Sequence, residues 1–217
     1  MKFFIGMLCA LVLVSGCAWF GGENLEKPAA ELIQDGVNSF DKGNYQSAIK
    51  NFEQLKDWYP FSKYAMLAEL KIADAHYGLE QYPEAVQAYE EFEQLHPRNE
   101  AIPYVIYQIG RCYYDQVDTV DRDQTPAQKA LETFQRLIRQ HPGDPYAQKA
   151  QSHIQVCYQS LAGHDFYVGM FYYKAKRYEA AKQRFMGVLT KYPDTGVQYR
   201  ALLYLADCEA VLSKSSQ

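Results

Sequence analysis

The amino-acid sequence predicts an all-α chain that folds as a superhelical solenoid of four to five helix-hairpin repeats. A pattern of alanine, then an aromatic residue, then proline occurs four times with the same internal spacing. Between these signals, apolar residues recur at spacings of three and four, as on one face of a helix. Valine, isoleucine and threonine do not form alternating runs, so a β-sheet has little support. Regular repetition of helical units is typical of solenoids, in which each unit buries its apolar face against the next.

The four copies share one spacing. In each, an aromatic residue follows an alanine by four positions and a proline follows the aromatic by eight: Ala48, Phe52 and Pro60; Ala85, Tyr89 and Pro97; Ala130, Phe134 and Pro142; Ala181, Phe185 and Pro193. A spacing of four puts alanine and aromatic on one helix face, and the proline ends the helix. The preceding helix carries a small residue with an aromatic four residues later, and these small residues are Gly36, Ala73, Gly110 and Gly169. We therefore expect the second helix of each hairpin to approach the first closely at the small residue.

The prolines set the boundaries of the repeats. We expect repeats near residues 29–60, 61–97, 103–142 and 146–193, and a partial fifth over residues 197–217, announced by Ala206 and without its second helix. Proline-to-proline spacings of 37, 45 and 51 residues make the array irregular. The polar residues 115–126 predict an inserted loop. An apolar stripe over residues 147–161 predicts an added helix that runs on into residues 166–174, with Gly163 as a candidate kink.

The first residues have the pattern of an export signal. Lys2 precedes an apolar run over residues 3–14, which is too short to span a bilayer because a spanning helix needs roughly 20 residues. Residues 13–17, Leu-Val-Ser-Gly-Cys, resemble the lipobox of bacterial lipoproteins, whose cysteine receives diacylglycerol. We therefore predict a signal peptide over residues 1–16 and a lipidated N-terminus and linker over residues 17–28, with Cys17 as the lipidated residue. The alternative is an ordinary signal peptide with an incidental cysteine.

Composition excludes several classes of function. With 22 Lys+Arg against 26 Asp+Glu the net charge is −4, which is not the basic balance of a nucleic-acid binder. Cys112, Cys157 and Cys208 are odd in number and lack CxxC spacing, so neither a disulfide framework nor a zinc site is expected. No phosphate-binding glycine loop, GxSxG or HExxH motif is present. We expect no enzyme, no cofactor and no metal, and an aromatic-rich surface that binds proteins.

The repeat resembles the tetratricopeptide repeat (TPR), and the order of motifs resembles the BamD family of lipoproteins of the outer-membrane β-barrel assembly machinery. The resemblance covers essentially the whole chain. It is carried by the lipobox, by Tyr59-Pro60-Phe61-Ser62-x-Tyr64-Ala65, by the insertion motif Asp121-Arg122-Asp123-x-Thr125-Pro126, by Leu161-Ala162-x-His164, and by Tyr178-x-Ala180-Ala181-x-x-Arg184. It implies five TPRs, a lipid anchor on the periplasmic face of the outer membrane, and docking to a POTRA domain of the barrel protein BamA. It also implies contacts with other lipoproteins of the machinery and with unfolded outer-membrane β-barrel proteins.

The same resemblance suggests partner-binding residues. Arg184 matches a basic residue of the fourth repeat that would pair with an acid of BamA. Tyr59, Phe61 and Tyr64 are candidates for an N-terminal groove that meets a barrel substrate, and Arg122 in the insertion is a further candidate. Two other readings stay open: another envelope TPR lipoprotein, such as a pilotin for a secretin or a cell-wall coordinator, and an enzyme that uses the insertion loop. The irregular spacings favour the assembly scaffold.

Overall fold

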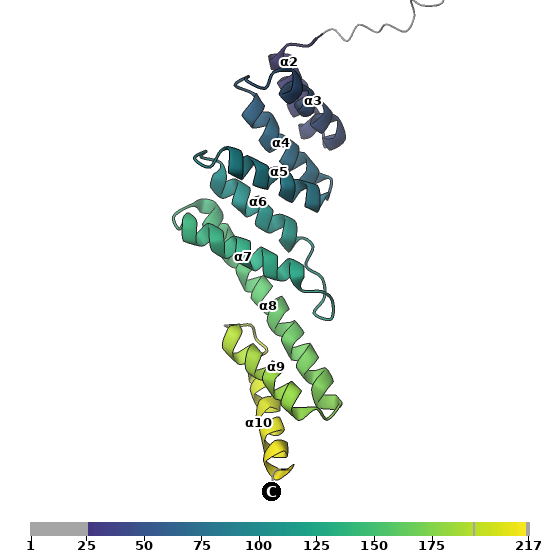
Figure 1. Cartoon of the computed structure of the whole chain (residues 1–217), viewed down its shortest axis with the longest axis vertical. Helices are drawn as coiled ribbons and strands as arrows, with labels where there is room; N and C mark the ends of the chain where they lie inside the picture. The colour runs from purple at the N-terminus through teal and green to yellow at the C-terminus, as the bar shows by residue number, and fades with distance from the viewer. Residues whose placement is uncertain (1–25, 193, 216–217) are drawn as a thin grey trace, which may run out of the picture.

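The computed structural model of the chain describes residues 26–192 and 194–215, and in these ranges the regular structure is entirely helical. The predicted all-α class is thereby confirmed, while the signal peptide, Cys17 and Pro193 lie outside the described residues. The helices are α2 (Ala29–Asp41), α3 (Tyr45–Trp58), α4 (Ala65–Gly78), α5 (Tyr82–Leu95), α6 (Ile102–Tyr114), α7 (Thr125–Gln140), α8 (Pro145–Lys174), α9 (Tyr178–Lys191) and α10 (Gln198–Ser215). Consecutive helices pack against one another and form an elongated stack from α2 to α10 (Figure 1).

Three of the hairpins turn in the same way. The turns from α2 to α3, from α4 to α5 and from α8 to α9 each place one residue at positive φ: Gly43 at 75°, Glu80 at 58° and Lys176 at 59°. In each, the backbone N–H of that residue donates to a carbonyl three residues back, on Phe40, Tyr77 and Tyr173 respectively. This satisfies carbonyls that the end of the first helix leaves without partners. The third hairpin lacks this turn because the insertion separates α6 from α7.

The small residues allow close contact inside the hairpins. A Cβ added at Gly36 would lie 2.2 Å from the ring of Phe52, at Gly110 2.4 Å from Phe134, and at Gly169 2.7 Å from Phe185. All three phenylalanine side chains are fully buried. The predicted pairing of the small residue in the first helix with the aromatic in the second is therefore confirmed in these hairpins.

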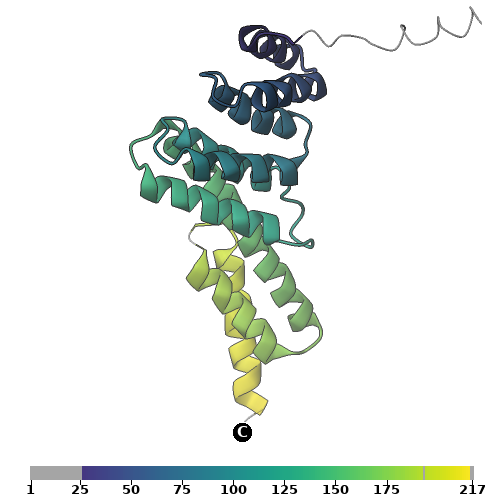
Figure 2. The same cartoon turned by 45° about the horizontal axis from the view of Figure 1, so that its top comes forward.

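Three groups of buried residues form the core of the part of the chain that the structure describes. We call them the N-terminal cluster, on α2–α4 around Phe52, the central cluster, on α4–α8 around Phe134, and the C-terminal cluster, on α8–α10 around Phe185. The 30-residue helix α8 is unbroken at Gly163 and contributes to both the central and the C-terminal clusters. Its length is evident in Figure 2, where it runs diagonally from the upper hairpins to α9 and α10. The predicted run-on helix is confirmed.

The insertion is held against α8. A Cβ at Gly163 would lie 2.7 Å from Val120 Cγ1, His164 Nδ1 lies 2.7 Å from the Val120 carbonyl oxygen, and the Ser160 hydroxyl donates to Gln124 at 2.7 Å. The loop therefore packs over the middle of α8, at the boundary between two core clusters. Among the helices described, none is long and apolar enough to cross a membrane.

Candidate partner-binding surfaces

The turn between α3 and α4 holds three residues predicted to bind a partner. Tyr59 donates its hydroxyl to the backbone carbonyl of Lys27 at 3.0 Å and packs on the N-terminal cluster. Tyr64 packs on the same cluster, with Lys63 Nζ 5.0 Å from its ring centroid. Phe61 is fully exposed at 101 %. Phe61 alone therefore offers its whole ring to a partner, whereas the two tyrosines mainly position the turn.

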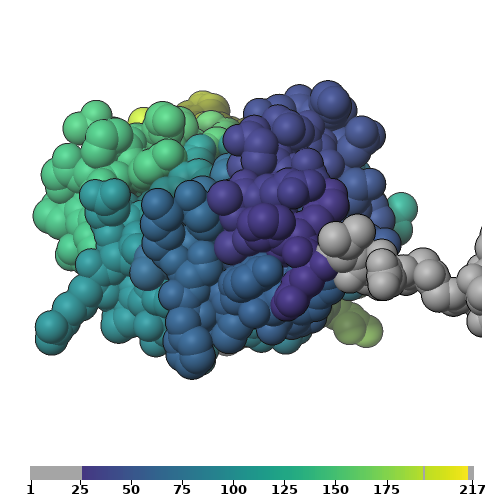
Figure 3. Space-filling model, turned by 90° about the horizontal axis from the view of Figure 1, so that it is seen from above, coloured from purple at the N-terminus to yellow at the C-terminus, as the bar shows by residue number. Residues whose placement is uncertain are grey.

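Two further exposed apolar residues follow Phe61 closely in the chain. Met66 and Leu67, in the first turn of α4, are 41 % and 42 % exposed. We call Phe61, Met66 and Leu67 the N-terminal apolar surface. It lies near the N-terminal end of the stack, which Figure 3 views end-on with α2 and α3 in front of the later helices.

Arg122 lies on the inserted loop. Both ends of this loop are tied down: Asp115 accepts hydrogen bonds from Tyr77 and Arg111, and the Gln124 side chain bonds two loop carbonyls. The side chain of Arg122 is exposed and forms no ion pair with any residue in the described ranges. Its guanidinium is consequently available to an acidic partner from a fixed position.

Arg184 has a partner within the chain. Its Nη1 donates to Oδ1 of Asp165 at 2.8 Å, and the hydroxyl of Tyr192 donates to Oδ2 of the same carboxylate at 3.1 Å. Asp165 is buried, whereas the Arg184 side chain is 45 % exposed. Burial and the charge of Asp165 raise the pKa of Tyr192 to about 12. Arg184 thus neutralises a buried carboxylate on one side and faces solvent on the other.

A second buried carboxylate joins the second and third hairpins. Tyr89 and Tyr104 both donate to Oδ1 of Asp74 at 2.7 Å, and Lys71 Nζ lies 2.9 Å from Oδ2. Burial, followed by the charge of Asp74, raises the pKa of both tyrosines. Sequence reasoning missed this group. The available signal was Tyr89, since it occupies the aromatic position where the three sister repeats carry phenylalanine and its buried hydroxyl needs an acceptor.

The described residues hold little that could perform covalent chemistry. No group of three or more His, Cys, Asp or Glu within them is arranged to hold a metal ion. Burial raises the pKa of the Cys112 and Cys157 thiols to about 12. The reactive thiolate is therefore disfavoured at both positions.

Comparison with known proteins gives the family. The model of a family described as "Outer membrane lipoprotein" (YfiO) matches residues 25–216. The chain belongs to this family. Two curated proteins that are similar to this chain are each named outer membrane protein assembly factor BamD. The one from Caulobacter vibrioides is 30 % identical over 84 % of this chain and 60 % of its own length, and the one from Pasteurella multocida is 27 % identical over 93 % and 81 %.

The chain thus spans less than two thirds of the Caulobacter relative and about four fifths of the Pasteurella relative. The resemblance to the BamD family that the motifs carry is confirmed by these matches. A solved kinesin light chain protein from Podosopora anserina, with nearly identical TPR-like repeats, aligns with 86 % of this chain and 95 % of its own chain. Its TM-score is 0.47 and its sequence identity 15 %.

Proposed function

We propose that this chain is a non-catalytic scaffold of the outer-membrane protein assembly machinery, anchored to the periplasmic face of the outer membrane by lipid on Cys17. The match of the outer membrane lipoprotein family over residues 25–216 carries the proposal. The name of the relatives, outer membrane protein assembly factor, supports the assembly role. A TPR solenoid suits a scaffold because each hairpin adds surface without needing a central active site.

The C-terminal end is the proposed docking surface for a POTRA domain of BamA. Arg184 supports this because part of its guanidinium remains exposed beside the C-terminal cluster. On α10, Tyr199, Leu202 and Leu203 are 72 %, 52 % and 52 % exposed. Exposed arginine, aromatic and apolar side chains on the last two helices are residue types that occur at interface centres.

The N-terminal apolar surface is the proposed contact for unfolded outer-membrane β-barrel proteins. Phe61 supplies a fully exposed ring, and the bonded Tyr59 and packed Tyr64 hold the turn that presents it. Arg122 would meet an acidic group on another lipoprotein of the machinery, because its loop is anchored while its charge is unpaired among the described residues. Substrate and companion proteins thereby have separate surfaces.

Capture of the protein from membranes solubilised in mild detergent tests the assembly role. We expect a POTRA-bearing barrel protein to be recovered with the chain in stoichiometric amount. Recovery of a secretin without such a barrel protein would instead support the pilotin alternative and refute the proposal. A variant with Cys17→Ser tests the anchor separately, since the chain should then leave the membrane fraction.

The pairing of Arg184 with Asp165 dictates the test of the docking residue. Reversing the charge at Arg184 would set two carboxylates side by side and disturb the fold as well as the docking. We therefore choose Arg184→Gln, with Lys182→Gln as the matched loss of one positive charge on the same helix and Asp165→Asn as the variant that releases Arg184. Docking should weaken at least tenfold in Arg184→Gln and persist in the other two. Equal weakening in Arg184→Gln and Asp165→Asn would show that the ion pair only supports the fold.

A further inference from the structure

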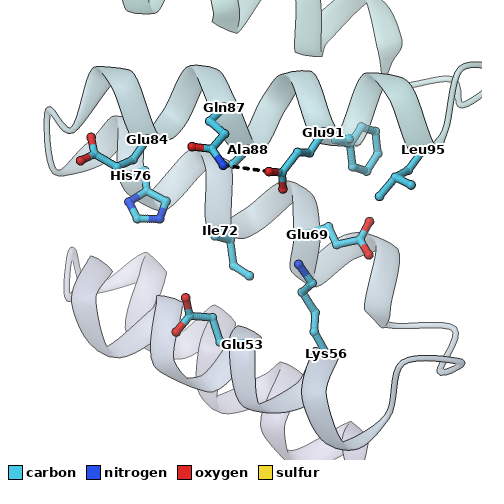
Figure 4. Close-up of a pocket in the computed structure, with 11 residues that line it drawn as sticks. Glu53, Lys56, Glu69, Ile72, His76, Glu84, Gln87, Ala88, Glu91 and Leu95 are labelled. Atoms are coloured by element: carbon cyan, nitrogen blue, oxygen red, sulfur yellow. Dashed lines mark hydrogen bonds between the residues drawn. The ribbon is translucent and has the colours of Figure 1, made fainter.

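A groove separates the second helices of the first two hairpins. Its walls are α3 and α5, and α4 forms its floor (Figure 4). Ile72, Ala88 and Phe92 give the groove an apolar base, and Leu95, 67 % exposed, stands at one end. The cavity volume is about 270 Å³, below the range of roughly 300–1,000 Å³ of small-molecule pockets. It can hold one or two side chains of a docked segment rather than a separate metabolite.

The rim of the groove is strongly acidic. Glu53, Glu69, Glu84 and Glu91 line it, against one lysine, Lys56. Glu69 is within 2.6 Å of His96. The other three carboxylates form no ion pair with a described residue, and Glu91 accepts only the side-chain amide of Gln87 at 3.0 Å. The groove therefore presents negative charge that the surrounding chain leaves largely uncompensated.

The neighbouring groove, between α5 and α7, shows the contrast. There Arg136 binds Glu93 through two hydrogen bonds across the opening, and Lys129 and Arg139 offset Glu90 and Glu132. Its charges balance, and an ion pair spans it. Uncompensated acid is thus a property of the α3–α5 groove and not of every gap between second helices in the described part of the chain.

The carboxylates are spread along the groove. Figure 4 shows Glu53 of α3 and Glu84 of α5 toward one end, whereas Glu69 and Glu91 lie in the half that holds Leu95. From Glu84 to Leu95 the helix rises about 16 Å at 1.5 Å per residue, which an extended segment covers with about five residues at roughly 3.3 Å each. A short segment can therefore reach from Glu53 and Glu84 to Leu95.

We propose that this groove docks a basic segment of a protein partner, with a Lys or Arg side chain between Glu53 and Glu84 and an apolar side chain against Leu95. Charge complementarity selects this occupant, because the apolar base receives one side chain while the acidic rim repels anionic segments. The inference does not depend on the proposed docking at Arg184 or on the N-terminal apolar surface, so failure of either leaves it intact.

The test uses the full chain in detergent and a fluorescein-labelled peptide, Gly-Lys-Lys-Ser-Ala-Ser-Leu-Gly, in which the leucine follows the lysines by four and five residues, and binding is followed by fluorescence anisotropy. The variant E53Q/E84Q/E91Q removes the unpaired carboxylates. The matched control, E100Q/E132Q/E179Q, removes three exposed carboxylates elsewhere, and Glu132, like Glu91, accepts a glutamine amide four residues before it. We expect at least a tenfold rise in Kd for the first variant and less than twofold for the control.

The proposed contact of an apolar side chain with Leu95 is tested separately. Leu95→Ser should weaken the peptide at least threefold, and should not affect a peptide in which serine replaces leucine. Equal weakening by the two triple variants would overturn the proposal, as would no effect of Leu95→Ser or tight binding of a peptide with glutamate in place of lysine. So would a dimer in sedimentation that only the E53Q/E84Q/E91Q variant dissociates, because the occupant would then be a second copy of this chain.

Discussion

Substitution of Gly110 by alanine should destabilise the chain, although alanine is the better helix former. A Cβ at this position would lie 2.4, 2.7 and 2.9 Å from three atoms of the Phe134 ring. Ordinary carbon contacts begin near 3.5 Å, so the ring or the helix must move. Phe134 is fully buried, and its ring also contacts those of Tyr107, Tyr114 and His153. The ring consequently has no open space into which it can withdraw.

The magnitude follows from two opposing terms. Overpacking of a well-filled core costs about 1–3 kcal/mol, and the tightness of three contacts places Gly110→Ala near the upper part of that range. Alanine gains about 1 kcal/mol over glycine in the interior of a helix. The net loss in the free energy of unfolding should therefore be about 1–2 kcal/mol. Gly143→Ala is the matched control, because nothing lies within 4 Å of a Cβ there, and it should change stability by less than about 0.5 kcal/mol.

Urea unfolding of the full chain in detergent, followed by circular dichroism, measures both variants. A double-mutant cycle with Phe134→Leu then isolates the contact. If the ring causes the strain, Gly110→Ala should cost less in the Phe134→Leu background, with a coupling energy of about 1 kcal/mol or more. Stabilisation by Gly110→Ala, or a coupling energy of zero, would refute the reasoning that the glycine exists for close helix approach.

Three further outcomes are expected. Asp74→Ala should lower the free energy of unfolding by about 3 kcal/mol, since it leaves the buried hydroxyl of Tyr89 without its acceptor. In a Tyr89→Phe background the loss of stability should be smaller, and an equal loss in both backgrounds would contradict this explanation. Burial and nearby Arg111 lower the pKa of His153, so the unfolded chain binds more protons below pH about 6.5 and stability should fall as the pH drops through that value. His153→Gln should reduce this pH dependence in thermal melts. If the melting temperature of the variant changes with pH as steeply as that of the unchanged chain, His153 is not the group responsible. Cys112 and Cys157, whose pKa burial raises to about 12, should react with an aromatic disulfide reagent at about pH 8 only after unfolding, whereas fast labelling of the native chain would show that the core opens.

The hairpin packing could be predicted from the sequence because it rests on local spacing. The pairing of Gly36 with Phe52 follows from two positions that recur in every repeat and from the small volume of glycine. The long helix α8 could also be predicted from the sequence, since its apolar residues keep helical spacing through Gly163. Both features depend on residues whose partners lie in the same or the next helix.

The polar groups of the candidate surfaces could not be predicted in the same way. The partners of Asp74 come from α4, α5 and α6, and no single periodic pattern relates three helices. The pairing of Arg184 with Asp165 was hidden for a similar reason, because an arginine on a helix surface has the same local pattern whether it meets solvent or a buried carboxylate. The groove between α3 and α5 depends on the distance between two helices, which the repeat spacing does not determine.

Helix α8 has a mechanical consequence. Its 30 residues extend about 45 Å at 1.5 Å per residue, and they carry Cys157 in the central cluster and Phe166 in the C-terminal cluster. No loop separates the two clusters along this helix. Helix α8 therefore joins them rigidly. A torque that a partner applies to α9 and α10 is therefore transmitted to the central cluster, because α8 has no hinge between the two clusters.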